Sequence, residues 1–120
     1  MRKLIALFVV AVAFSALSPA RAAVNTVVAG PGAFALTYAT PRVVLDRSAP
    51  STFVNADPAP HNVWSVATRK INNVNVPLFS SAVINLGETA PITFLPSVAA
   101  GDYEFFCTLH PGMRGTATVR

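Results

Sequence analysis

The segment GDYEFFCTLHPGM, residues 101–113, decides the fold class of this chain. Side chains alternate between the two faces of a β-strand, so Tyr103, Phe105 and Cys107 are expected to share the inward face. Phe106 then lies on the opposite face and is expected to be partly exposed. The segment therefore predicts a half-buried strand that ends at Cys107, followed by a tight turn through Pro111 and Gly112.

Short runs rich in β-branched and aromatic residues recur in the rest of the chain. The candidate strands are residues 25–29, 33–39, 42–45, 51–55, 62–67, 91–95, 102–106 and 115–119. Clusters of Gly, Pro, Asn and Asp separate them, as turns require. The pattern predicts an all-β fold, an antiparallel sandwich or barrel of seven to eight strands. Residues 68–82 are polar and Asn-rich, and we expect an irregular connection there, with at most one short strand or helical turn.

The N-terminal segment has the pattern of a secretory signal peptide. Arg2 and Lys3 precede an apolar run over residues 4–17, and the small-residue sequence of residues 20–22 follows. We expect cleavage after residue 22, which leaves residues 23–120 as one exported domain. A retained membrane anchor is the alternative, but the run is shorter than the roughly 20 apolar residues that span a bilayer. The segment has no Arg-Arg pair, which favours export before folding and metal loading afterwards.

Charge excludes some classes of partner. The whole chain has nine Lys and Arg and five Asp and Glu, a formal net charge of +4. Three of the nine basic residues lie in the predicted signal, so six would remain and the mature net charge would be +1. No basic stripe is left, and binding to nucleic acid or to an anionic membrane is not expected.

One short stretch concentrates residue types that are rare in this chain. Cys107 is the only Cys, and His110 and Met113, each one of two of its kind, follow within seven positions. One Cys cannot form an intramolecular disulfide, and a free thiol is a liability in an oxidising compartment unless it is buried, paired or bound. The other His, His61, begins a predicted strand and can meet a strand end at the same end of a sandwich. One thiolate, two imidazoles and a thioether are the donors of a blue-copper electron-transfer centre.

Each residue also has a simpler interpretation. Cys107 could be an inert buried thiol, His61 a turn residue bonded to backbone, and Met113 a packing side chain. Met113 is the weakest ligand candidate of the set. Zinc is the competing metal, but structural zinc usually takes four Cys or His ligands and only three are present.

Further stretches accompany the Cys-His-Met loop. They are Asn55-Ala56-Asp57, Pro60-His61-Asn62-Val63 and Leu86-Gly87-Glu88-Thr89. Together with residues 101–115 they resemble the cupredoxin family of type 1 blue copper proteins, in the plastocyanin and amicyanin group. The short Cys-x-x-His-Pro-x-Met loop is more similar to amicyanin. The resemblance implies a Greek-key β-sandwich and one copper ion held by His61, Cys107, His110 and Met113.

The resemblance also implies roles for the neighbours of these ligands. Asn62 would donate its backbone N–H to the Cys107 sulfur, and its side chain would join Thr108 across the two loops. Pro111 has no N–H for the sulfur, which favours Cu(II) and a low reduction potential. Partner docking would use the apolar surface of Leu109, His110, Pro111 and Gly112. Phe106 is a weaker second electron route, and Tyr103 and Trp64 are expected in the core.

The predicted function is a periplasmic or otherwise exported monomer that carries one electron between a donor and an acceptor protein. A copper carrier or chaperone is the second hypothesis, although such proteins favour exposed, exchangeable ligands. A metal-free interaction module is the third. We do not expect an enzyme, because the ligand set leaves no open coordination position and both His residues are assigned to the metal.

Overall fold

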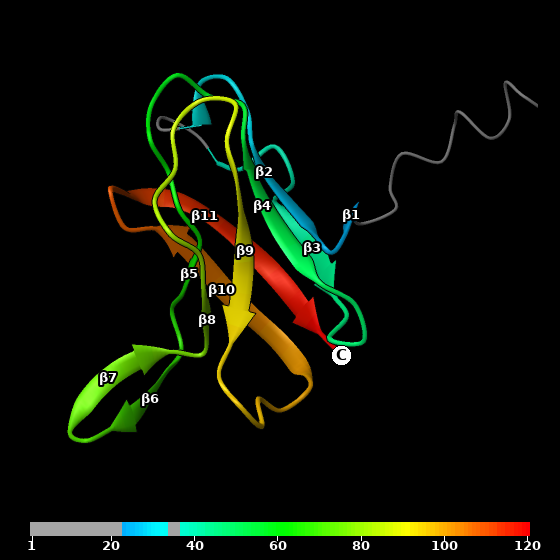
Figure 1. Cartoon of the computed structure of the whole chain (residues 1–120), viewed down its shortest axis with the longest axis vertical. Helices are drawn as coiled ribbons and strands as arrows, with labels where there is room; N and C mark the ends of the chain where they lie inside the picture. The colour runs from blue at the N-terminus through cyan, green and yellow to red at the C-terminus, as the bar shows by residue number, and fades with distance from the viewer. Residues whose placement is uncertain (1–22, 34–36) are drawn as a thin grey trace, which may run out of the picture.

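The computed structural model describes residues 23–33 and 37–120. These residues form eleven β-strands and no α-helix (Figure 1). The strands are β1 (Ala23–Val24), β2 (Thr26–Ala29), β3 (Arg42–Leu45), β4 (Ser51–Asn55), β5 (Trp64–Ser65), β6 (Thr68–Ile71), β7 (Val74–Pro77), β8 (Phe79–Ser80), β9 (Thr89–Phe94), β10 (Gly101–Cys107) and β11 (His110–Val119). The predicted all-β class is confirmed, with more strands than the seven to eight expected. The predicted signal, residues 1–22, lies outside the described residues.

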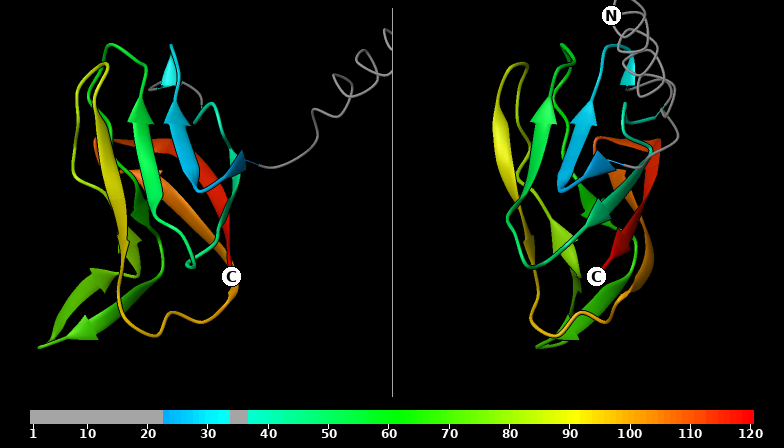
Figure 2. Two further views of the ribbon diagram at one scale, coloured as in Figure 1. Left: turned by 45° about the vertical axis from the view of Figure 1, so that its right-hand side comes forward. Right: turned by 90° about the vertical axis from the view of Figure 1, so that its right-hand side faces the viewer.

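Nine of the strands form one sheet that nearly closes on itself. Their order is β1-β3-β11-β10-β5-β8-β9-β4-β2, and the two end strands are separated in sequence by Asn25 alone. Asn25 has a left-handed backbone, with φ of 56°. Its N–H donates to Val44 O on one side, and its carbonyl accepts the N–H of Thr52 on the other. The chain therefore passes from one layer to the other at this residue, and Figure 2 shows the two layers facing each other. The buried apolar side chains form one core cluster.

The predicted antiparallel arrangement holds for most strand pairs but not for all of them. The pairs β1–β3, β3–β11 and β2–β4 are parallel, and the other pairs are antiparallel. A parallel pair cannot be joined by a tight turn and needs a long connection. Residues far apart in sequence make these pairs, and local alternation carries no information about which strand lies alongside.

Two predicted strands are absent or shorter. Residues 33 and 37–39 form no strand, and residues 34–36 lie outside the described part of the chain. Tyr38 is instead a buried anchor whose hydroxyl donates to Asn62 O at 2.6 Å. Only Trp64 and Ser65 of the predicted strand 62–67 are paired as a strand. Trp64 is partly exposed, so its prediction as a core residue is wrong.

Residues 68–82 are more regular than predicted. They contain a complete hairpin, β6 and β7, and then the short strand β8. Asn72 and Asn73 form its turn, with φ of 52° and 64°. Two successive left-handed residues are what a two-residue type I′ hairpin requires, and Asn tolerates that conformation better than most side chains. The hairpin forms a separate two-stranded sheet that projects from the body, at the lower left of Figure 1.

The core lies between the layers and is rich in aromatic rings. Phe105 packs against Tyr38 with ring centroids 4.8 Å apart and against Phe79 at 6.4 Å. Phe105 and Cys107 are fully buried and Phe106 is partly exposed, which confirms the predicted alternation in β10. The core and the sheet therefore hold the end of β10 in a fixed position.

In the described residues no helix exists that could cross a membrane.

Candidate metal centre

The four predicted ligands come from three places in the chain and lie at one end of the sandwich. Cys107 ends β10, and His110 and Met113 lie in β11. Strand β11 begins at His110, five residues before the predicted strand 115–119. Cys107 pairs directly with His110, so Thr108 and Leu109 turn the chain between them. The predicted turn through Pro111 and Gly112 is wrong, because both residues lie in β11. His61 is not at a strand start as predicted, because it lies three residues before β5 and makes an isolated bridge with Ile84.

His61 and Cys107 lie close together although 46 positions separate them. The distance from His61 Nδ1 to Cys107 Sγ is 3.6 Å, and both residues are fully buried. Metal–nitrogen and metal–sulfur bonds of about 2.0 and 2.3 Å at an angle of roughly 110–120° separate two donors by about 3.5–3.7 Å. The observed distance therefore fits two donors that share one ion.

His110 and Met113 complete the neighbourhood. The rings of His61 and His110 have centroids 4.8 Å apart. Met113 is fully buried, whereas His110 is partly exposed. Among the residues that the structure describes, no three His, Cys, Asp or Glu side chains already form a compact metal-binding group. The geometry brings the donor types together, and the assignment of all four as ligands is a proposal.

A carboxylate that we did not predict lies behind His61. Nε2 of His61 is 2.7 Å from Oδ2 of Asp57, and both side chains are buried. Asp57 Oδ1 also accepts the N–H of Gly32 at 2.7 Å, and Oδ2 accepts the N–H of Ala59 at 3.2 Å. Burial raises the pKa of Asp57, but the hydrogen bonds from His61, Gly32 and Ala59 together outweigh it and hold that pKa below its ordinary value. Both oxygens of the carboxylate therefore have hydrogen-bond partners.

The loop that carries His61 is built around Asn55, which we also did not predict as a site residue. Its Nδ2 donates to Ala59 O and Ile84 O, both at 2.9 Å, and its Oδ1 accepts the Asp57 N–H at 2.9 Å. The His61 N–H donates to Ile84 O at 3.1 Å, and its carbonyl accepts the Ile84 N–H at 2.9 Å. The backbone of His61 is thus held by Ile84, whose carbonyl also accepts the hydrogen bond from Asn55.

Asn62 joins the two ligand loops. Its Oδ1 accepts the backbone N–H of Thr108 at 2.9 Å and the Thr108 hydroxyl at 3.2 Å. The Tyr38 hydroxyl bonds to the carbonyl of Asn62. The predicted hydrogen bond from the Asn62 amide to the Cys107 sulfur stays a prediction.

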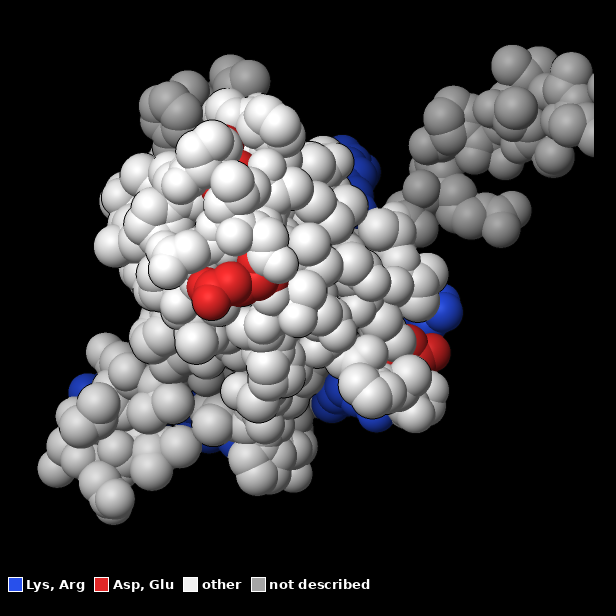
Figure 3. Space-filling model, turned by 45° about the horizontal axis from the view of Figure 1, so that its top comes forward, with Lys and Arg blue, Asp and Glu red and all other residues white. Residues whose placement is uncertain are grey.

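The surface over this end is mostly uncharged. Leu109, Pro111 and Gly112 are exposed around the partly buried His110. Figure 3, which brings this end forward, shows a few acidic atoms and leaves the basic atoms at the periphery. The surface is therefore suited to weak apolar contacts.

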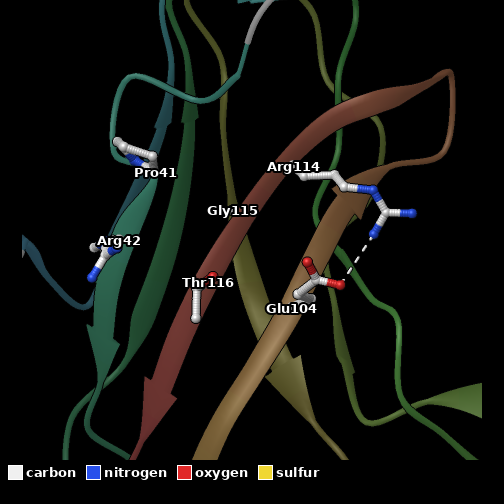
Figure 4. A pocket seen from close by; sticks show the side chains of 6 residues that line it. All are labelled: Pro41, Arg42, Glu104, Arg114, Gly115 and Thr116. Carbon is white, nitrogen blue, oxygen red and sulfur yellow. Dashed lines mark hydrogen bonds and ion pairs between the residues drawn. The ribbon is translucent and has the colours of Figure 1, made fainter.

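A shallow hollow of about 250 Å³ lies elsewhere, over β3, β10 and β11 (Figure 4). Its lining residues are Pro41, Arg42, Glu104, Arg114, Gly115 and Thr116. Arg114 makes an exposed ion pair with Glu104 at 3.4 Å and lies over the Phe106 ring, 5.7 Å from its centroid. An exposed pair of this kind stabilises by about 0–1 kcal/mol. The hollow contains none of the predicted copper ligands.

Comparison with known proteins decides the family. The copper-binding proteins of the plastocyanin/azurin family match residues 24–120. The chain belongs to this family. Its cofactor is copper, and the predicted cupredoxin resemblance is confirmed.

Individual relatives agree with this result. Amicyanin from Paracoccus versutus is 33% identical over 84 residues, which cover 70% of this chain and 58% of the amicyanin. The chain thus spans a little over half of that relative. A purple cupredoxin from Nitrosopumilus maritimus has a TM-score of 0.60 and 25% identity, covering 79% of this chain and 98% of the other. A reduced amicyanin variant has a TM-score of 0.57 and 27% sequence identity, and the match covers 86% of this chain and 87% of the amicyanin. The cupredoxin-like fold is therefore confirmed.

Proposed function

We propose that this chain is a small exported electron carrier that holds one type 1 copper ion through His61, Cys107, His110 and Met113. The observation that carries the proposal is the 3.6 Å approach of His61 Nδ1 to Cys107 Sγ, two fully buried residues at one end of the sandwich. Copper supplies a one-electron Cu(II)/Cu(I) couple when bound. Soft sulfur donors favour Cu(I) and imidazole serves both states.

The residues around the donors would keep the site rigid. Asn62 ties the His61 loop to the turn after Cys107, and Asn55 fixes the backbone before His61. Donors that cannot move keep the same positions around Cu(II) and Cu(I). Little reorganisation is then needed when an electron arrives or leaves. Met113 would supply a weak, long axial contact, and its loss would retune the site more than empty it.

Electron exchange would occur through His110, which is partly exposed although its Nε2 is buried. The exposed residues next to it in the chain, Leu109, Pro111 and Gly112, are uncharged. Transient redox complexes are small, and an uncharged apolar patch favours brief contacts over tight binding. The partners would be a donor and an acceptor redox protein, with the carrier itself a monomer.

The second hypothesis, a copper carrier or chaperone, needs a metal that can be handed over. Cys107, Met113 and His61 are all completely buried. Burial of three of the four donors opposes ready exchange, and it favours electron transfer over metal delivery. Fast electron self-exchange and reversible voltammetry would support the carrier, and rapid loss of copper to a competing chelator would support the chaperone.

Export rests on the sequence of residues 1–22. Its basic start, apolar run and small-residue end are those of a secretory signal. Expression of the whole chain in a bacterial host, followed by mass spectrometry of the periplasmic fraction, tests it. A product that begins at Ala23 is expected, and a product that keeps residues 1–22 would contradict export by cleavage.

The copper site is tested by spectroscopy. Cu(II) is added to residues 23–120, and visible and EPR spectra are recorded for the wild type and for Cys107→Ser. An intense thiolate-to-copper band and a narrow copper hyperfine splitting are expected in the wild type alone. Cys107→Ser removes the thiolate with little change in volume, so a folded variant without the band assigns the band to Cys107. Absence of the band in folded, copper-loaded wild type would contradict the proposal.

A further inference from the structure

Asp57 lies where it can determine how His61 presents itself to a metal. A neutral imidazole carries one proton, on Nδ1 or on Nε2, and only the nitrogen without the proton can bind a metal. Nδ1 of His61 faces Cys107 Sγ and Nε2 faces Asp57 Oδ2, at 3.6 and 2.7 Å. Both carboxylate oxygens of Asp57 already accept backbone N–H groups, so Asp57 acts as an acceptor toward Nε2 as well and favours the proton on that atom.

The position of Asp57 does not depend on His61 alone. Oδ1 accepts the Gly32 N–H and Oδ2 accepts the Ala59 N–H, so one carboxylate joins two loops. Asn55 holds the Asp57 backbone N–H as well. Asp57 is 1% exposed, which keeps water from competing for its oxygens. The acceptor for His61 is thus fixed by the distant Gly32 N–H and by Asn55 and Ala59 of its own loop.

We propose that Asp57 is a positioning residue of the copper centre, which holds His61 in the Nε2–H tautomer with Nδ1 directed at the ion and places a buried negative charge behind the ligand. The inference rests on the proposed copper site. A ligating His that donates its second ring N–H to a carboxylate becomes a more basic ligand and keeps a fixed ring orientation. The added charge stabilises Cu(II) more than Cu(I), so it lowers the reduction potential.

An Asn at position 57 cannot reproduce this arrangement. The amide has one oxygen, whereas the two carboxylate oxygens of Asp57 accept three N–H groups. If the amide nitrogen faces His61, it donates to Nε2 and drives the imidazole proton to Nδ1. If the nitrogen faces the loop, it meets the Gly32 N–H and one loop contact is lost.

The test compares wild type, Asp57→Asn and the control Asp102→Asn. Asp102 is exposed at the opposite end of β10 from Cys107. Far-UV circular dichroism and thermal unfolding establish that each variant is folded. Long-range proton–nitrogen NMR of the metal-free proteins then identifies which nitrogen of His61 carries the proton. Redox titration of the copper-loaded proteins measures the potential.

We expect His61 to be protonated at Nε2 in wild type and in Asp102→Asn. In Asp57→Asn we expect a population protonated at Nδ1 and a higher reduction potential. A folded Asp57→Asn with an unchanged tautomer and an unchanged potential would reduce Asp57 to a loop contact and overturn the proposal.

The tautomer measurement on the wild type needs neither the variant nor copper. Protonation at Nδ1 alone in the wild type would overturn the proposal even if Asp57→Asn did not fold. If wild type instead lacks the blue copper band, the proposed function fails. The NMR result still decides the arrangement of His61 and Asp57, so the two failures are distinguishable.

Discussion

Asn62 accepts two hydrogen bonds from Thr108, one from the backbone N–H at 2.9 Å and one from the hydroxyl at 3.2 Å, and so joins loops that are 46 positions apart. Asn62→Ala would leave the Thr108 N–H without this acceptor. The expected loss is about 1–3 kcal/mol of unfolding free energy in the metal-free protein, measured by denaturant titration. Thr108→Val removes only the hydroxyl bond and serves as the control with a smaller loss. Equal losses in both variants would mean that the backbone bond contributes nothing.

Pro111→Ala introduces a backbone N–H next to the proposed His110 ligand. We expect the reduction potential to rise, because an N–H donated to the thiolate withdraws charge and favours Cu(I). One such bond is worth on the order of 1 kcal/mol, or roughly 40 mV for a one-electron couple. Redox titration measures the change, and Pro50→Ala, at an exposed proline before β4, controls for the loss of a ring. No rise in potential would count against a role for Pro111 in tuning the site.

Leu109→Asp tests the docking surface. Leu109 is 48% exposed beside His110, and a charge there would meet a like charge when two molecules approach through this face. We expect electron self-exchange, measured by NMR line broadening, to slow by about tenfold or more, equivalent to about 1.4 kcal/mol. Val74→Asp, on the projecting hairpin and 60% exposed in the wild type, is the matched control. A similar slowing in both variants would mean that Leu109 does not belong to the docking face.

Tyr38→Phe removes both a buried hydrogen bond and an ionisable hydroxyl, and the two losses affect stability in different pH ranges. Burial, and next the negative charge of the Cys107 thiolate, raise the pKa of Tyr38 far above its ordinary value. A raised pKa stabilises the fold below the unfolded value of about 10, and this stabilisation is lost as the pH rises above it. The wild-type unfolding free energy should therefore fall above pH 10 more steeply than that of Tyr38→Phe. Near pH 7 the variant should lose about 1–3 kcal/mol, because the carbonyl of Asn62 loses its buried donor.

The check for Tyr38 is urea unfolding of the metal-free proteins between pH 7 and pH 11. Two curves that stay parallel above pH 10 would contradict the raised pKa. Tyr103, whose hydroxyl donates to Ala99 O at an exposed site, supplies the control Tyr103→Phe. When Tyr38→Phe is introduced into the Tyr103→Phe protein, it should change the unfolding free energy by the same amount as it does in the wild type.

Gly115→Ala tests the packing behind the metal end. A Cβ on Gly115 would lie 2.5 Å from Cζ of Phe105, whose ring covers this position from the neighbouring strand. Phe105 is fully buried against Tyr38, so the ring has no free space into which it can move. We expect a loss of about 1–3 kcal/mol in unfolding free energy. Gly112→Ala, where an added Cβ meets nothing within 4 Å, should be nearly neutral.

The β10 strand and the donor types could be predicted because both depend on neighbouring positions. The alternation around Phe105 sets which side chains point inward, and Cys107, His110 and Met113 lie within seven positions of the chain. The hairpin at Asn72 and Asn73 was also present in the sequence as an Asn-Asn pair between two short runs. It was missed because Asn-rich polar segments are equally typical of irregular loops.

Asp57 and Asn55 could not be assigned in the same way. A carboxylate four residues before His61 is a weak signal, since the same spacing in a Pro-rich loop is usually solvated. Its role depends on the Gly32 N–H, which approaches from 25 positions away and exists as a donor only after the sandwich closes. The parallel pairing of β3 with β11 has the same origin, because strand partners are chosen by packing across the core.

By itself, the sequence determined which donors this protein has and that Cys107 points into a β-rich core, because residue type and strand alternation are local properties. The tertiary structure alone decided that His61 Nδ1 faces the sulfur while Nε2 is held by Asp57. That choice depends on the hydrogen bond from the Gly32 N–H to the Asp57 carboxylate, and these two groups, 25 positions apart, become neighbours only when burial of the core brings the two layers together.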